Sequence, residues 1–305
     1  MMEFAAYIGK KHQYLTKPTY LFQRTGNYPS LSRELMLLSM ISRFKATKSS
    51  EPQTIDEFLE NSQIMVASTD PTAKEKHSWL VAAKGGNNGE SHNHNDIGNF
   101  VVYHDSQPVV IDLGRDTYTS QTFGNRRYEM VNNRSAYHNV PLINGLEQST
   151  GRKFKATNVR HTATDSLSMI EMNIEKAYSK ESHAASWQRN ITLDRIKNSV
   201  EIKDNYRLDS IAIDKDRQTG EVFDNKLVLM CYGKPVISKK GTIILQGGKV
   251  RLIYDAALVS ASIEKLEMND GIMKKQWSDN VYRILLRLND NYPKAIVKCR
   301  FVSLK

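Results

Sequence analysis

Cysteine is nearly absent from this chain of 305 residues, because only Cys231 and Cys299 occur. Two thiols cannot build a disulfide scaffold, and they exclude a zinc finger made from cysteines. Both lie inside apolar, strand-like runs, so we expect them to be buried free thiols. Long apolar runs are missing too, since none reaches the ~18–20 residues that a membrane-spanning helix needs. The sequence therefore predicts a chain without a membrane span, whose core forms without disulfide bonds.

The N-terminus also lacks the pattern of a secretory signal. It reads MMEFAAYIGKKHQYL, with charges inside the first eleven residues and no apolar stretch that leads to a small-residue cleavage site. Either the protein stays in the cytoplasm, or its natural N-terminus lies upstream of this sequence. Lys and Arg number 43 against 33 Asp and Glu, a net charge of +10. This charge favours a polyanionic partner without distinguishing nucleic acid, anionic lipid and acidic polysaccharide.

Two regions differ in their hydrophobic period. Residues 1–61 are expected to be a helical segment, because residues 31–44 carry an apolar stripe at the helical period and residues 54–60 suit a second short helix. Residues 62–305 instead show short β-branched runs, separated by turn pairs such as Asn144-Gly145 and Asp270-Gly271. No helical pattern alternates with these runs. We therefore predict a mainly β protein, a large antiparallel β-sandwich (double sheet) with a short N-terminal helical segment.

Residues that carry chemistry gather between positions 84 and 148. His92 and His94 lie two residues apart, and in an extended segment they would share one face. Asp112 ends an apolar run and needs a partner, because an unpaired carboxylate is costly there. His138 adds a third imidazole from a polar loop. Two imidazoles and a carboxylate, as in His94, Asp112 and His138, suit Zn²⁺ and leave a fourth position open, although ordinary hydrogen-bonded loop histidines would look the same.

Several strings in this region resemble the heparinase II/III-like family of polysaccharide lyases. They are ESHNHNDIGNFVVYH, PVVIDLGRDTYT, RYE, SAYHNVPLING and KAY, and the resemblance covers roughly residues 62–210. In that family a helical toroid precedes a β-sandwich, and an acidic glycan binds between them. The resemblance implies a Zn²⁺ ion at the same His94, Asp112 and His138. It implies β-elimination from a uronate-containing glycan, such as a glycosaminoglycan or an alginate-like polymer.

The resemblance also implies roles for neighbouring residues. His92 is the candidate for neutralising the uronate carboxylate or for abstracting the proton, as β-elimination requires both tasks. Tyr118 and Tyr128 are candidates for proton transfer, although for each tyrosine taken singly a loop anchor with a satisfied hydroxyl is the favoured interpretation. The residues expected to bind substrate are Asn93, Asn95, Arg126, Arg127 and Arg134, although the three arginines would equally suit a solvated face. The remaining histidines, among them His77 and His104, are expected to be structural.

The sequence also departs from the family. Only residues 1–61 precede the β region, so we expect them to be the remnant of an α/α toroid and the active site to be incomplete without a helical partner. A periplasmic or cell-envelope location follows from the resemblance alone. The chain is thus expected to be a carbon–oxygen lyase, or its inactive β half. A non-catalytic, zinc-containing module that binds acidic glycans is the alternative, and a nuclease is disfavoured because the basic residues are scattered.

Overall fold

The structure is a computed structural model, and it describes residues 54–70, 77–209, 224–289 and 292–304. All of these residues belong to one compact unit, Thr54–Lys305. The helical stripe expected over residues 31–44, and most of the predicted segment 1–61, lie outside the described residues. Within the described part, no helix combines the length and the apolar character needed to cross a membrane.

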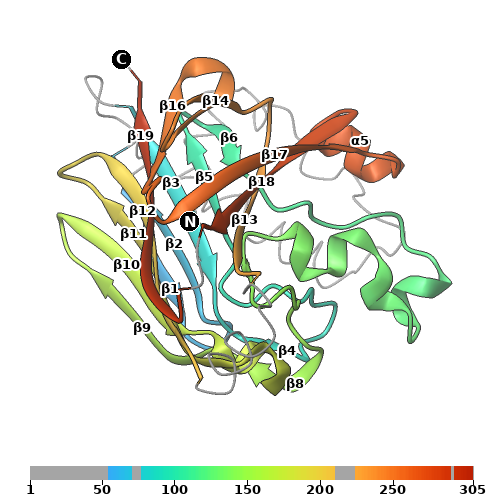
Figure 1. The fold of residues 1–305 in the computed structure, drawn as a ribbon. Coiled ribbons are helices and arrows are strands. Elements are labelled where there is room, and N and C mark those ends of the chain that lie inside the picture. The colour runs from blue at the N-terminus through green and yellow to red at the C-terminus, as the bar shows by residue number, and fades with distance from the viewer. Residues whose placement is uncertain (1–53, 71–76, 210–223, 290–291, 305) are drawn as a thin grey trace, which may run out of the picture. The chain divides into compact units, whose positions relative to one another are not determined.

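Strands dominate the described residues, and they form two large sheets (Figure 1). The first sheet has nine strands in the order β1-β2-β3-β5-β6-β13-β18-β17, with β7 paired to β13 at the side. These strands are β1 (Asp56–Leu59), β2 (Ile64–Ser68), β3 (Trp79–Lys84), β5 (Phe100–His104), β6 (Gln107–Val110), β7 (Pro141–Leu142), β13 (Lys226–Cys231), β17 (Val259–Glu267) and β18 (Asn280–Leu288).

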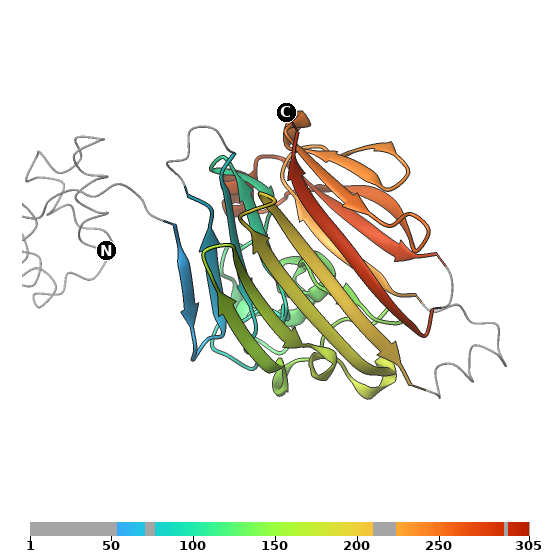
Figure 2. The same cartoon turned by 90° about the vertical axis from the view of Figure 1, so that its left-hand side faces the viewer.

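The second sheet has eight strands in the order β14-β15-β16-β19-β12-β11-β10-β9. Figure 2 shows β9 to β12 and the red β19 side by side across the front of the molecule. The strands are β9 (Thr157–Ala163), β10 (Leu167–Asn173), β11 (Ala184–Asp194), β12 (Ser199–Leu208), β14 (Val236–Lys239), β15 (Thr242–Leu245), β16 (Val250–Tyr254) and β19 (Lys294–Ser303). A separate two-stranded sheet joins β4 (Asn87–Asn88) to β8 (Gly151–Lys155). The pairings between described strands are all antiparallel, so the predicted antiparallel double sheet is confirmed.

The main core lies between the two large sheets, and alternation along the strands builds it. In β11, Trp187, Arg189, Ile191 and Leu193 are buried, while the residues between them are partly exposed. This period of two turns one face of each strand inward. A second apolar cluster forms on the other face of β13, where Trp277 of α5 (Gly271–Trp277) contributes. The strand β13 is consequently buried on both faces.

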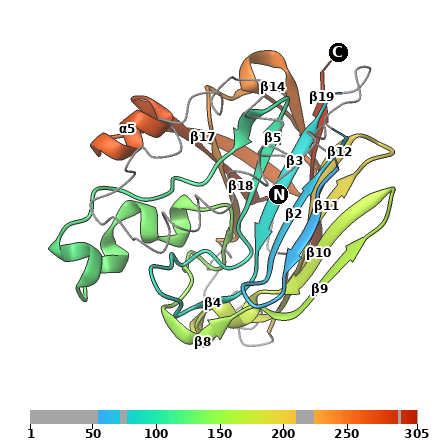
Figure 3. The ribbon, with the colours of Figure 1, turned by 180° about the vertical axis from the view of Figure 1, so that it is seen from behind.

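Short 3-10 helices occupy the long connection between β6 and β7, and they hold much of the candidate site. Figures 1 and 3 show this green segment beside the sandwich, on the same side as α5. The 3-10 helices of this connection are η1 (Ser120–Phe123), η2 (Arg127–Glu129), η3 (Val131–Asn133) and η4 (Ser135–Tyr137). Elsewhere, η5 (Glu175–Ala177) and η6 (Lys180–Ser182) lie between β10 and β11, and η7 (Gln246–Gly248) lies between β15 and β16.

Two local expectations are wrong. Residues 54–60 do not form a helix, because Asp56–Leu59 is strand β1, which pairs with β2 along its length. Ladder hydrogen bonds along the edge of the sheet outweigh the helical preference of its acidic residues. Asp270-Gly271 is not a simple turn either. The Asp270 carboxylate accepts from the backbone N–H groups of Ile272 and Met273, and so caps α5.

Candidate metal centre and active-site loop

The hairpin of β5 and β6 brings Asp112 to its place, just beyond the end of β6. Its Oδ1 accepts the backbone N–H of Gly114 at 2.8 Å, and its Oδ2 accepts Asn99 Nδ2 at 2.5 Å. Oδ2 also lies 2.7 Å from His138 Nδ1. The expectation that Asp112 needs partners is therefore confirmed. These bonds fix the orientation of the carboxylate beside His138.

His138 follows η4, and the next residue anchors it to the sandwich. The Asn139 amide donates to the carbonyl oxygens of Phe100 and Ile111, and its side-chain oxygen accepts the backbone N–H of Met230. Every polar group of the Asn139 side chain is thereby used to join β5, the end of β6 and β13. Because Asn139 is held so firmly, the adjacent His138 has little freedom to move away from Asp112.

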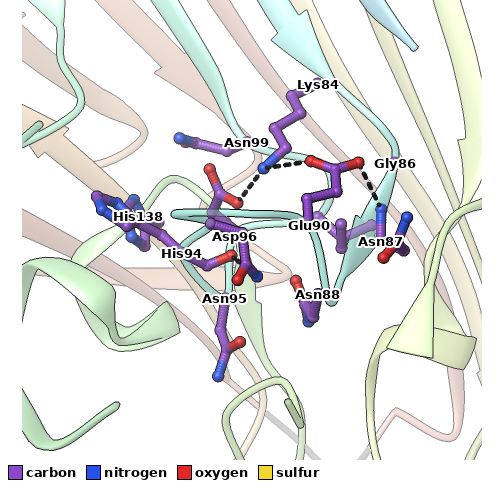
Figure 4. A network of polar contacts seen from close by, with 12 residues as sticks. Lys84, Gly86, Asn87, Asn88, Glu90, His94, Asn95, Asp96, Asn99 and His138 are labelled. Atoms are coloured by element: carbon purple, nitrogen blue, oxygen red, sulfur yellow. Dashed lines mark hydrogen bonds and ion pairs between the residues drawn. The ribbon is translucent and has the colours of Figure 1, made fainter. Parts of the chain in front are cut away.

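His94 completes a group of three possible metal ligands. Ligand atoms of His94, Asp112 and His138 all lie within 4.8 Å of one another, and the His94 and His138 rings are 5.2 Å apart. Figure 4 shows His94 and His138 next to each other. Three side chains from separate parts of the chain therefore converge, as the sequence analysis expected. Their burial and charges set their protonation. Burial, together with the neighbouring His138, lowers the pKa of His94 to about 4, so its ring is neutral near pH 7.

Asp112 and His138 form a coupled pair with opposite shifts. Burial by itself lowers the pKa of His138, but the charge and hydrogen bond of Asp112 outweigh it and raise that pKa above its usual value. Burial likewise opposes the charged form of Asp112, yet the charge of His138 and the hydrogen bonds to the carboxylate hold its pKa well below the usual range. Both shifts favour the charged forms of the pair, so a metal ion that binds His138 competes with a proton for its ring.

The donor set fits a zinc ion. Two imidazoles and one carboxylate are ligands that zinc prefers. His138 Nε2 is buried and has no hydrogen-bond partner among the described residues. A buried nitrogen without a partner is uncommon, and a ligand is one explanation for it. Asp112 is oriented by Gly114 and Asn99, as outer-shell groups orient ligands in metal sites.

His92 lies apart from this group. It has a left-handed backbone with φ 57°, so the segment is not extended and the expected common face with His94 is not present. The ring is exposed and packs near Tyr118 and Phe123, with centroid distances of 6.3 and 5.8 Å. The guanidinium of Arg115 lies over the Tyr118 ring at 5.4 Å. We call His92, Arg115, Tyr118 and Phe123 the His92 cluster, and all four are exposed.

Asn93 and Asn95 position the loop between these two groups of side chains. Tyr128 donates its hydroxyl to Asn93 Oδ1 at 2.9 Å, and Arg127 donates to the Asn93 carbonyl at 2.7 Å. The Asn95 amide donates to the backbone of Gln148. Both asparagines are buried. The loop is thus held by Arg127 and Tyr128 through Asn93, and by the side-chain nitrogen of Asn95.

The two other predicted substrate-binding arginines pair with carboxylates. Arg126 is bound to Glu129 on the exposed surface, and Arg134 is bound to Glu147. Arg134 also lies over the Tyr137 ring at 5.6 Å. The arginines therefore do not form one free cationic cluster. Of the three, Arg126 is the most exposed, with 76% of its side chain accessible.

Sequence reasoning missed the buried residues that connect the loop to the sandwich. The Arg189 guanidinium pairs with Asp204 and also donates to the carbonyl oxygens of Gly98 and Asn139. The Gln148 side chain accepts the backbone N–H of Ile97 and donates to the backbone carbonyl of the same residue. The available signal was a charged residue, Arg189, inside the strand-like run WQRNITLD at residues 187–194. It marks a buried ion pair, and here the pair supports the loop.

Lys84, at the end of β3, anchors the start of this loop. Its ammonium lies 2.8 Å from Asp96 and 3.8 Å from Glu90, as the dashed lines in Figure 4 show. Burial lowers the pKa of Lys84, but the charge of Asp96 outweighs this effect and raises it. The lysine therefore stays charged and holds two loop acids, one of them two residues from His94.

Two hollows on the surface lie away from the candidate site. Two surface hollows, of about 630 and 450 Å³, are lined by residues of the second sheet and of the β1–β9 side. None of the candidate site residues lines either of them. The four side chains of the His92 cluster are instead exposed to solvent.

The chain is similar to known lyases. Residues 60–210 match the family model described as heparinase II/III-like, C-terminal. The fold is similar to that of heparan sulfate lyase HepC from Pedobacter heparinus, with a TM-score of 0.62, 13% identity, and coverage of 90% of this chain and 40% of HepC. A solved heparinase III is similar with a TM-score of 0.57, 12% identity, and coverage of 97% and 47%. No curated protein sequence matches. The chain thus spans less than half the length of these lyases.

Proposed function

Because residues 60–210 belong to the heparinase II/III-like family in its C-terminal part, we propose that this chain carries the zinc-organised active-site loop of a polysaccharide lyase. Its substrate would be a uronate-containing acidic glycan, cleaved by β-elimination. The proposal rests on one observation, which is that His94, Asp112 and His138 converge. His94 lies two residues after the exposed His92. The lyase neighbours in the comparison support the fold and the reaction class.

β-Elimination sets three tasks for the side chains. The proton at C5 of the uronate must be removed, the glycosidic oxygen at C4 must leave, and the growing negative charge on the carboxylate must be stabilised. A base and an acid within hydrogen-bonding reach perform the first two tasks. Hydrogen-bond donors or cations aimed at the carboxylate perform the third.

The His92 cluster offers groups for each task. We assign the stabilisation of the sugar carboxylate to Arg115 or His92, because both side chains are exposed and both can donate a hydrogen bond to it. Proton transfer is assigned to His92 and Tyr118. Tyr118 is half exposed, whereas the Tyr128 hydroxyl is already bound to Asn93. Tyr128 is therefore a positioning residue in this proposal.

Zinc, when bound by His94, Asp112 and His138, would supply a fixed charge that holds their three segments together. The resemblance favours this structural role over direct catalysis, and so does the geometry. The three ligands are packed among Asn99, Gly114 and Asn139, whereas the His92 ring is turned toward Tyr118. The loop that carries His92 is consequently expected to be displaced when zinc is removed.

The partner and the location belong to the same proposal. A substrate groove needs a second wall beside the open His92 cluster, and we propose that a helical toroid supplies it. A periplasmic or cell-envelope location would place the protein where extracellular glycans are degraded. Fractionation of the native cells, followed by detection of the protein with an antibody, tests the location.

The activity test uses the chain with zinc and four glycans: heparan sulfate, hyaluronan, chondroitin sulfate and alginate. The unsaturated uronate product is followed by its ultraviolet absorbance. We expect product from at least one glycan, loss of product in His92→Ala, and a reduced rate in Tyr118→Phe. His161→Ala is the matched control, because this histidine stacks on Phe58 away from the loop. Absence of product from every glycan, with zinc bound, would refute catalysis by this chain.

A non-catalytic glycan-binding module is the second candidate. The exposed rings of Tyr118 and Phe123 beside Arg115 favour it, because sugars stack on aromatic rings and arginine binds carboxylate and sulfate groups. Binding of an acidic oligosaccharide, without any product, that survives His92→Ala but is weakened by Arg115→Ala would support this function.

A further inference from the structure

A second group of metal-type side chains lies at the turn between β5 and β6. His77 Nδ1 is 2.7 Å from Asp105 Oδ2, and His104 Nδ1 is 3.6 Å from the same oxygen. The two imidazole rings are 4.9 Å apart. The side-chain oxygen of Gln246, in η7, lies 3.0 Å from His104 Nδ1. We call His77, His104, Asp105 and Gln246 the hairpin cluster.

A second contact orients three of the four members. Asp105 Oδ1 accepts the backbone N–H of Ser78 at 2.8 Å, which leaves Oδ2 facing the imidazoles. The Gln246 amide donates to the His104 carbonyl at 3.0 Å, so its oxygen faces the ring. His104 Nε2 lies 2.9 Å from the Ser303 hydroxyl. Such outer contacts fix the orientation of ligands in metal sites.

The turn between β5 and β6 sets the backbone at the hairpin cluster. Asp105 and Ser106 have left-handed φ angles of 49° and 61°, and Gln246 has one of 50°. His104 pairs with Gln107, so Asp105 and Ser106 form a two-residue turn, and such a turn takes positive φ at both positions. The turn thereby fixes the place of Asp105 beside His104.

His104 is suited to donate a lone pair. Its side chain is completely buried, and both of its ring nitrogens face polar side chains. With Nε2 facing the Ser303 hydroxyl, Nδ1 is directed toward Asp105 and Gln246. His77 is half exposed, which leaves a route for an ion to enter.

We propose that the hairpin cluster binds a divalent transition-metal ion, such as Zn²⁺, through the two imidazoles and the Asp105 carboxylate. The Gln246 oxygen is the fourth ligand. Two nitrogens and two oxygens form a set that suits zinc, and imidazole also suits nickel and copper.

The position of the hairpin cluster gives the ion a structural role. His77 precedes β3 and His104 ends β5, both in the first sheet, whereas Gln246 and Ser303 belong to segments of the second sheet. The ion would therefore connect the two sheets. The site is independent of the loop that carries His94, because it lies at the other end of the β5–β6 hairpin, roughly 15 Å away along the strand. Figure 3 shows β14 and the end of β19 on the opposite side of the molecule from β4 and β8.

The test counts zinc ions bound to the full chain. Protein stripped with a chelator is re-equilibrated with Zn²⁺, separated from free metal, and analysed by plasma mass spectrometry. We expect two ions per chain in the wild type and one in His77→Ala. His94→Ala should also hold one, and the double variant none. His77 is half exposed, so its removal leaves the core intact.

The matched control is His183→Ala. His183 also faces a carboxylate, with Nδ1 3.3 Å from Asp209, but it has no second imidazole within the described ligand groups. It should keep both ions. Addition of Zn²⁺ should raise the Tm of His94→Ala and leave that of the His77→Ala/His94→Ala double variant unchanged. A single ion that His94→Ala loses and His77→Ala keeps would overturn this proposal and leave the first site standing. A single ion with the reverse pattern would support it and refute the first site.

Discussion

The buried ion pair of Arg189 and Asp204 allows the most demanding test of how the sandwich supports the loop. The guanidinium donates to both Asp204 oxygens at 2.8 Å, and neither side chain is more than 2% exposed. Its remaining nitrogen donates to the Gly98 and Asn139 carbonyl oxygens at 3.0 and 2.7 Å. These two residues flank the loop side of the candidate metal centre, next to Asn99 and His138.

Removal of the carboxylate in Asp204→Ala strands a buried cation. Breaking a buried pair in this way costs about 3–5 kcal/mol, because the remaining charge has lost its compensation. The Trp187 Nε1–H loses its acceptor at the same time, and an unsatisfied buried donor costs about 1–3 kcal/mol. We expect a loss of at least about 3 kcal/mol in the free energy of unfolding. For a domain of this size the Tm should fall by roughly 6–20 °C.

Urea denaturation of the wild type and the variant, followed by tryptophan fluorescence, measures the change. The double variant Arg189→Met/Asp204→Leu should recover part of the loss, because apolar residues often replace a buried pair at little cost. It should not recover zinc affinity, since the Gly98 and Asn139 carbonyls still lack their donor. Glu129→Ala is the exposed control, and it should leave stability unchanged. A loss below about 1 kcal/mol in Asp204→Ala would refute the role of the pair.

Three further predictions follow from the same region and the core. Gly98→Ala should lower the free energy of unfolding by about 1–3 kcal/mol in urea denaturation, because Gly98 has φ 86° and its Cβ would lie 3.2 Å from a neighbouring side chain. His138→Ala should lower zinc affinity by more than the roughly 10–100-fold that loss of an outer-shell partner causes. The affinity is measured by competition with a chelator, and His161→Ala should leave it unchanged. Burial raises the pKa of Cys231 and of Cys299 to about 12. Both thiols should therefore stay unmodified by iodoacetamide at pH 8 until the protein unfolds. Labelling of the native protein at the rate of a free thiol would contradict this prediction.

Much of the fold could be predicted because burial follows a short period. In β11 and β12 the inward residues alternate along the chain, and this alternation is readable without any partner. Cys231 and Cys299 were expected to be buried free thiols, and they are. The predicted helix at residues 54–60 was wrong because strand β1 depends on pairing with β2, which local preference does not record.

The candidate site could be predicted only in part. The residue types of His94, Asp112 and His138 indicated that they could share an ion, and the structure brings them together. The sequence did not indicate that the loop turns through a left-handed residue at His92 and separates its ring from that of His94. It also did not indicate that the predicted arginines are bound by Glu129, by Glu147 and by backbone carbonyls. Both features depend on how the loop folds back on itself.

The amino-acid sequence by itself determined the alternating strands, the absence of a disulfide framework and the need of Asp112 for partners, since each depends on neighbouring residues or on composition. Only the tertiary structure decided which distant groups meet. Arg189 reaches the carbonyls of the loop, and His77 and His104 meet Gln246 at the end of the sandwich. Such meetings depend on strand order and on the register between sheets, and a hydrophobic period records which face of a strand is buried but not what lies opposite it.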